Sequence, residues 1–128
     1  MNLDIGLVAE KTEMVNYDNT AVSYGSGSIE VYATPAMIGL MEGAAILCVD
    51  DKLDEGLSTV GISLNVKHLA ATPVGMNVTA TAKLIEIAER KLTFSVEAFD
   101  EKDKIGEGIH ERFIIKVDKF LEKCNSKK

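Results

Sequence analysis

The chain has 128 residues, of which 46% are hydrophobic and 27% charged, and its net charge is −6 at pH 7. This length predicts a single domain over residues 1–128, large enough to bury a core of its own. The acidic balance leaves no basic stripe to neutralise phosphates, which argues against nucleic acid or an anionic membrane surface as a partner.

The amino-terminal segment carries early acidic residues and no continuous apolar stretch, so we expect no signal peptide. Cys48 lies among apolar residues and Cys124 in a charged tail, far apart in the sequence. A disulfide is therefore not expected, and a reducing cytoplasm is the predicted location. With two histidines and these two scattered cysteines, the sequence supports no zinc site, so no metal is expected.

The first third of the chain predicts two short strands separated by a polar loop. The first strand is placed within residues 3–14 by the alternation of Leu3, Ile5 and Leu7. Residues 17–28 are polar and end in a glycine- and serine-rich tip, which predicts a loop that acts as a lid. A second short strand over residues 28–32 would lead into a helix.

The helix is the most apolar part of the sequence. Thr34 followed by Pro35 is typical of a helix start, with the hydroxyl as N-cap. Between residues 36 and 49 the only charged residue is Glu42. A helix of about 16 residues measures about 24 Å, too short to span a membrane. We therefore expect a central helix wrapped by other elements, carrying one carboxylate where a carboxylate is costly.

Four longer strands follow, predicted over residues 59–68, 77–87, 91–99 and 105–117, and a short helix begins at about residue 118. In the first of these, one face carries Val60, Ile62, Leu64, Val66 and His68. In the last, the polar side chains share one face, which we interpret as surface or interface: His110, Arg112 and Lys116.

This order predicts an α+β fold in which a curved antiparallel sheet wraps one long central helix. A single sheet cannot cover every side of an apolar helix. The remaining apolar surface predicts a second subunit, most simply in an isologous dimer.

Three polar residues and one glycine are candidates for a site, and each also has a structural interpretation. Thr34 is typical of a helix cap, and Glu42 of a neutral or paired buried carboxylate that could serve as a base. His68 is typical of a strand end, although the apolar face places it toward the helix. Gly61 indicates a bulge or a close backbone approach.

Taken together, these segments resemble the hot-dog fold and, more narrowly, the fluoroacetyl-CoA thioesterase-like branch of that superfamily. The resemblance covers roughly residues 15–118. It rests on Ala33-Thr34-Pro35, Met41-Glu42-Gly43-Ala44-Ala45, Ser58-Thr59-Val60-Gly61, Lys67-His68-Leu69, Ala71-Thr72-Pro73-Val74-Gly75, Arg90-Lys91-Leu92-Thr93-Phe94 and Gly108-x-His110-x-Arg112.

The resemblance implies a homodimer, or a tetramer, that hydrolyses an acyl-CoA thioester to free acid and CoA, with CoA entering only as part of the substrate and no other cofactor. A threonine, a glutamate and a histidine act in that branch, and by position they match Thr34, Glu42 and His68. Gly61 matches a glycine whose backbone lies near the thioester. The branch's fluoroacetyl-specific member has a phenylalanine-bearing lid, but residues 15–28 contain no phenylalanine, so selectivity for a fluorinated substrate does not follow.

The distance between Thr34 and Glu42 along the helix leaves open how these two residues and His68 come together. Thr34 and Glu42 are about 12 Å apart along a helix, whereas an imidazole bridging two groups spans about 7–8 Å. Either side-chain reach closes the gap, or the set is shared between two subunits. Two other functions remain open: a non-catalytic acyl-CoA or pantetheine binder in which Glu42 and His68 shape the pocket, and a hydratase, whose Asp/His-type segment is missing.

Overall fold

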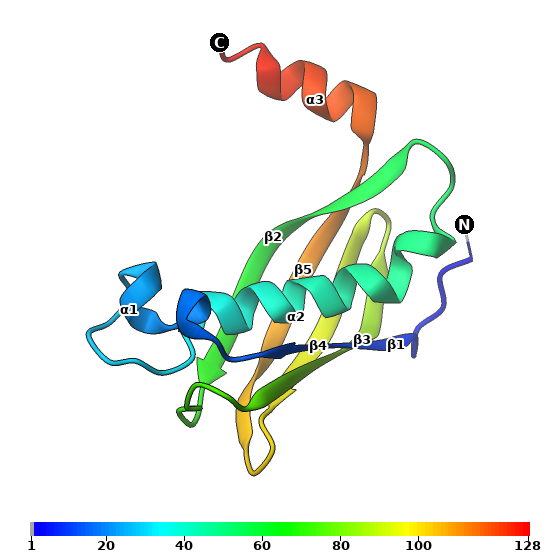
Figure 1. Ribbon diagram of the computed structural model, residues 1–128. Helices are drawn as coiled ribbons and strands as arrows, with labels where there is room; N and C mark the ends of the chain where they lie inside the picture. The colour runs from blue at the N-terminus through cyan, green and yellow to red at the C-terminus, as the bar shows by residue number, and fades with distance from the viewer. Residues whose placement is uncertain (1) are drawn as a thin grey trace.

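A computed structural model describes residues 2–128. One antiparallel sheet of five strands, in the order β1-β3-β4-β5-β2, curls around a long helix (Figure 1). The strands are β1 (Val8–Met14), β2 (Leu57–His68), β3 (Asn77–Ala88), β4 (Lys91–Phe99) and β5 (Lys104–Lys116), and the helix is α2 (Thr34–Val49). The predicted α+β architecture is confirmed.

The remaining elements are short. They are η1 (Tyr17–Asn19), α1 (Ala21–Tyr24), η2 (Asp50–Lys52) and α3 (Val117–Asn125). In Figure 1, α1 lies beyond the amino-terminal end of α2, and α3 stands away from the sheet at the end of β5. Within residues 2–128, no helix is both long and apolar enough to cross a membrane.

The amino-terminal predictions are corrected in three places. The first strand begins at Val8, not Leu3. The predicted strand over 28–32 is absent, and the segment forms only isolated bridges from Tyr32 to Thr20 and from Val31 to Pro73. The predicted lid loop contains η1 and α1, because Thr20 caps α1 by accepting a hydrogen bond from the Ser23 backbone.

The core lies between α2 and the concave face of the sheet, and α2 is central as predicted. Met37 and Met41 of α2 pack over Gly106 of β5, where an added Cβ would come within 2.5 Å of the Met37 sulfur. Glycine at this position therefore allows the helix to approach the sheet. Burial of each large aliphatic side chain in this layer contributes about 1.5–3 kcal/mol. One side of α2 stays uncovered, and Leu47 is 53% exposed there.

A bulge in β2 changes which of its side chains face α2. The pairing with β5 shifts between Gly61 and Ser63, so Ile62 has no counterpart. Because an extra residue reverses the alternation, Ile62 points outward and is 52% exposed. The prediction of one continuous apolar face over residues 60–68 is therefore wrong. The helix-facing positions before the bulge are Thr59 and Gly61, and those after it are Leu64, Val66 and His68.

Candidate active site

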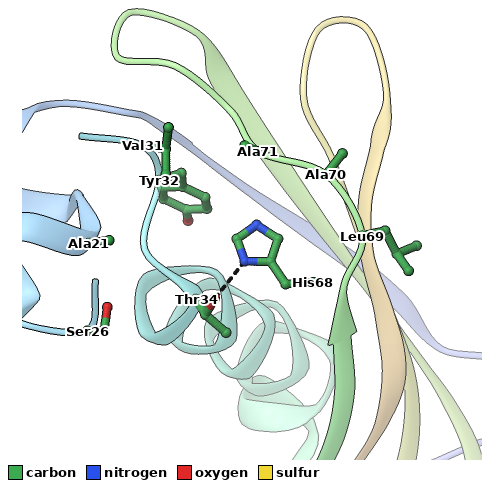
Figure 2. Close-up of a pocket in the computed structure, with 9 residues that line it drawn as sticks. All are labelled: Ala21, Ser26, Val31, Tyr32, Thr34, His68, Leu69, Ala70 and Ala71. Carbon is green, nitrogen blue, oxygen red and sulfur yellow. Dashed lines mark hydrogen bonds between the residues drawn. The ribbon is translucent and has the colours of Figure 1, made fainter. Parts of the chain in front are cut away.

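The first half of the site is a direct contact between α2 and the end of β2. Thr34 Oγ1 lies 2.7 Å from His68 Nδ1 (Figure 2). Thr34 is the first residue of α2 and makes no capping hydrogen bond to the helix, whose N-cap is Ala33. The N-cap interpretation of Thr34 is thus wrong: its hydroxyl is directed at the imidazole, and Pro35 alone favours the helix start.

The second ring nitrogen of His68 is buried without a partner. Among residues 2–128, His68 Nε2 is the buried side-chain nitrogen or oxygen atom that has no hydrogen-bond partner. Burial also lowers the pKa of His68 below its usual value, which favours the neutral ring. Leaving such an atom unpaired costs about 1–3 kcal/mol, so Nε2 is available to a water, a bound ligand or a group of a second subunit.

A cavity of about 400 Å³ opens beside this pair. Small side chains from the segment after η1, Ala21, Ser26 and Val31, form one wall, and Leu69 to Ala71 form another (Figure 2). Tyr32 also lines the cavity, and its hydroxyl donates a hydrogen bond to Glu13. The cavity is therefore lined by apolar side chains, several of them small, together with four polar residues: Ser26, Tyr32, Thr34 and His68.

The second half of the site is a polar cluster beneath the middle of α2. Arg112 of β5 donates from Nε to Thr59 Oγ1 at 2.8 Å and from a terminal nitrogen to the Thr59 carbonyl at 3.0 Å. Its other terminal nitrogen lies 3.5 Å from Glu42 Oε2. The Glu42 side chain is 36% exposed, so it is an ion-paired carboxylate at the edge of the core rather than a fully buried one.

His110 completes this cluster and was missed from the sequence. Its ring is fully buried and stacks near Phe94, so the prediction of a surface or interface position is wrong for it and for Arg112. Alternate residues of β5 face α2, and polar side chains are tolerated there because each finds a partner. The one sequence signal was their alternation, which placed both on the same face.

The hydrogen bonds of His110 define its tautomer. Arg112 has only donors, so its N–H at 3.1 Å must donate to His110 Nε2. The proton then lies on Nδ1, which donates to the Ser63 carbonyl at 2.9 Å, just after the β2 bulge. Burial, reinforced by the neighbouring Arg112 charge, lowers the pKa of His110 and keeps the ring neutral.

Gly61 lies directly under the cluster. A Cβ placed on it would come 2.7 Å from Glu42 Oε2 and 3.2 Å from the His110 ring. A larger residue would displace the carboxylate, so glycine favours this close approach, and Gly61 also borders the bulge in β2. Both structural interpretations of this glycine are therefore correct.

One chain does not bring Glu42 to His68. The β2–β5 register pairs His68 with Gly106 and Gly61 with Arg112, and those two β5 positions are about 20 Å apart at about 3.3 Å per residue. Thr34 and His68 form one pole of the site, and Glu42 with Arg112 forms the other. The side-chain-reach alternative is not realised in the chain itself.

The neutral, buried His110 makes a prediction for stability. The unfolded chain protonates its histidines below about pH 6.5, while the folded state resists protonation of His110, so stability falls as the pH drops through that value. His110→Gln retains a donor and an acceptor without titrating. The unfolding free energy measured in urea should therefore fall less between pH 7.5 and pH 5.5 in this variant than in the unmodified protein. His68 is present in both proteins and cancels, and equal losses would contradict the assigned neutral state.

Comparison with known proteins places the chain in a family. The model of the family described as fluoroacetyl-CoA-specific thioesterase matches residues 15–118. A fluoroacetyl-CoA thioesterase from Streptantibioticus cattleyicolor is 43% identical over 98 residues, which is 77% of this chain and 70% of that protein. A solved structure of a fluoroacetyl-CoA thioesterase superposes with a TM-score of 0.94 at 34% identity, covering 100% of this chain and 99% of that one.

The fold extends to more distant proteins. A hot-dog-like protein from Thermanaerovibrio acidaminovorans, 24% identical, superposes with a TM-score of 0.87 over 96% of this chain and 91% of its own. The sheet-wrapped helix therefore defines a hot-dog protein of the thioester hydrolase class. Within that class, the chain belongs to the fluoroacetyl-CoA-specific thioesterase family.

Proposed function

We propose that this protein hydrolyses a small acyl-CoA thioester to the free acid and CoA, with Thr34, Glu42 and His68 as its catalytic residues. The observation that carries the proposal is the 2.7 Å contact between the Thr34 hydroxyl and His68, beside a cavity of about 400 Å³. An alcohol paired with a neutral imidazole is the arrangement by which proteins activate an oxygen nucleophile. The chemistry requires no resident cofactor, since CoA arrives with the substrate.

In this proposal His68 is the base. The neutral ring accepts the proton of the attacking oxygen, which is Thr34 Oγ1 or a water in its place, and returns it to the departing CoA sulfur. With the Thr34 hydroxyl donating to Nδ1, the proton of the neutral ring lies on Nε2. A carboxylate at Nε2 would orient the ring and stabilise its charged form, and Glu42 is the candidate. Attack by Thr34 forms an acyl ester on its hydroxyl, whereas direct attack by water does not. Mass spectrometry of a quenched slow reaction detects this ester.

Glu42 reaches His68 from a second subunit. β2 is an edge strand of 12 residues: β5 pairs with one side of it, and within residues 2–128 no strand pairs with the other side. Ile62 and Leu64 along it are exposed. Exposed edges of this length favour pairing with another chain. A twofold axis beside β2 would place the strands antiparallel, so the Gly61–Glu42 pole of the partner subunit would move toward the His68 pole of the first. The same pairing would cover Leu47 on α2.

The developing oxyanion has two sources of stabilisation. The amino terminus of α2 begins at Thr34, and helix amino termini present unpaired N–H groups and positive dipole to an anion. The second source is the backbone at Gly61, which carries no side chain of its own. Together, these donors would hold the thioester carbonyl as charge forms on it.

The acyl group is set by the wall of the cavity. Ala21, Ser26 and Val31 are small, and the segment 15–28 contains no phenylalanine to close over a two-carbon group. We therefore propose that acceptance of short, unfluorinated acyl chains accompanies any activity toward fluoroacetyl-CoA. Small lining side chains leave space for a longer acyl chain, which a bulky lid residue would fill. Burial of each additional methylene of that chain contributes about 0.8 kcal/mol.

Thiol release over a series of acyl-CoA substrates tests this function. Free CoA is trapped with a chromogenic disulfide while acetyl-, fluoroacetyl-, propionyl- and butyryl-CoA are offered to the dimeric protein. Hydrolysis of acetyl-CoA within about 200-fold of fluoroacetyl-CoA is expected, because a difference of one small group is worth only about 10–200-fold in a pocket. Saturable binding without thiol release would instead establish the non-catalytic acyl-CoA binder.

A further inference from the structure

A second concave surface lies far from Thr34 and His68, between α3 and the carboxyl-terminal end of β5. The cavity there has a volume of about 300 Å³. Its floor is apolar and includes two aromatic rings, Phe113 and Phe120, which are 37% and 40% exposed. Four cationic side chains surround this floor: Arg90, Lys116, Lys119 and Lys123. We call this surface the cationic groove.

The charge of the groove is unusual for this protein. The chain has a net charge of −6, yet the groove is lined by four cations and no acid. Among residues 2–128, none of the four has a carboxylate within salt-bridge distance. The acids of α3, Asp118 and Glu122, do not line the groove. Unpaired cations over exposed aromatic rings match a ligand that carries both phosphate and a flat ring.

We infer that the cationic groove binds the adenosine 3′-phosphate 5′-diphosphate end of the CoA substrate, with adenine over Phe113 and Phe120 and the phosphates held by Lys119 and Lys123. This inference rests on the proposed function, which supplies the CoA thioester. It adds a nucleotide site on α3, of which all but the first two residues lie outside the part matched by the family model.

The position of the groove fits the proposed dimer. Lys116 pairs with Leu57 at the start of β2, so the groove and His68 lie at opposite ends of a 12-residue strand, up to about 40 Å apart in one chain. The pantetheine arm cannot span that distance. In an antiparallel β2 pair, however, the Leu57 end of one strand lies beside the His68 end of the other. One subunit's groove would hold the nucleotide while the thioester enters the other subunit's cavity.

A truncated substrate tests the assignment. Acetyl-pantetheine carries the same thioester as acetyl-CoA but lacks the nucleotide. The test variant is Lys119→Ala/Lys123→Ala, and the matched control is Lys127→Ala/Lys128→Ala, which removes the same charge from the same end of the chain outside the groove. The readout is kcat/KM for acetyl-CoA divided by kcat/KM for acetyl-pantetheine, at low ionic strength where screening is weak.

We expect this ratio to fall about tenfold or more in the Lys119→Ala/Lys123→Ala variant, through KM for acetyl-CoA, and to change less than twofold in the control. An unchanged ratio, or equal falls in both variants, overturns the inference. If the unmodified protein hydrolyses neither substrate, the proposed function fails by itself. The groove is then judged by calorimetric titration with adenosine 3′,5′-bisphosphate: saturable binding lost in the first variant supports a nucleotide site, and no binding refutes it.

Discussion

Replacing His68 with alanine should lower kcat for acetyl-CoA by about 10² to 10⁴-fold, the usual contribution of a positioned general base. His68 Nδ1 lies 2.7 Å from the Thr34 hydroxyl, and burial lowers the pKa of His68, so the ring accepts a proton at neutral pH. Alanine leaves the hydroxyl in place but removes the acceptor. KM should change much less, because the imidazole acts mainly in the transition state. Steady-state thiol release measures both constants.

A structural explanation of that loss can be separated from a catalytic one. Lys67→Ala changes the exposed neighbour on the same strand and should keep activity within about twofold, since surface substitutions seldom perturb a fold. Circular dichroism and gel filtration should show the same fold and the same oligomer for both variants. Activity in His68→Ala close to that of Lys67→Ala would remove the histidine from the mechanism.

The second large effect is expected for Glu42→Gln, which keeps the shape of the side chain and removes its charge. We expect a loss of about 10² to 10⁴-fold in kcat, because an amide neither accepts a proton nor stabilises an imidazolium as a carboxylate does. The folded state should lose about 1 kcal/mol or less, since the Arg112–Glu42 contact is 3.5 Å long and the carboxylate is partly exposed. Arg112 retains its bonds to Thr59 and His110.

The decisive feature of the Glu42→Gln variant is a large loss in kcat with a small loss in the free energy of unfolding. Glu10→Gln makes the same chemical change on the exposed edge strand β1 and serves as the control. Kinetics and urea unfolding on both variants give the comparison. A Glu42→Gln enzyme that is stable and active would assign Glu42 a purely structural role as the counter-ion of Arg112.

Much of the architecture could be predicted from the sequence because its signals are local. The apolar segment after Thr34, interrupted by one charged residue, predicted the central helix, and clean alternation predicted β4 with its bounds, Lys91–Phe99. The second short strand failed because residues 28–32 find partners one bridge at a time and join no ladder. Hydrogen bonds between distant segments decide such cases, and a short apolar run does not reveal them.

The sequence suggested most residues of the candidate site, His110 excepted, but not how they are arranged. A bulge at Gly61 is decided by packing against Glu42 and by β5 pairing, so the facing of Ile62 could not follow from alternation alone. His110 was assigned to the surface or an interface because it shares one face of the predicted strand with two charged residues, Arg112 and Lys116. Its burial depends on the Ser63 carbonyl and the Arg112 donor, which lie elsewhere in the chain. The Thr34 hydroxyl likewise contacts His68 and not the helix backbone, because the fold brings the end of β2 next to the start of α2.

The central claim is that one active site combines His68 of one subunit with Glu42 of its partner. Mixing inactive His68→Ala and Glu42→Gln proteins under conditions that exchange subunits tests it most directly. Half of the dimers become mixed, and each then holds one site with both native residues, so activity should return to about a quarter of the unmodified level. No recovery after exchange, with mixed dimers demonstrated by native mass spectrometry, would contradict the shared site.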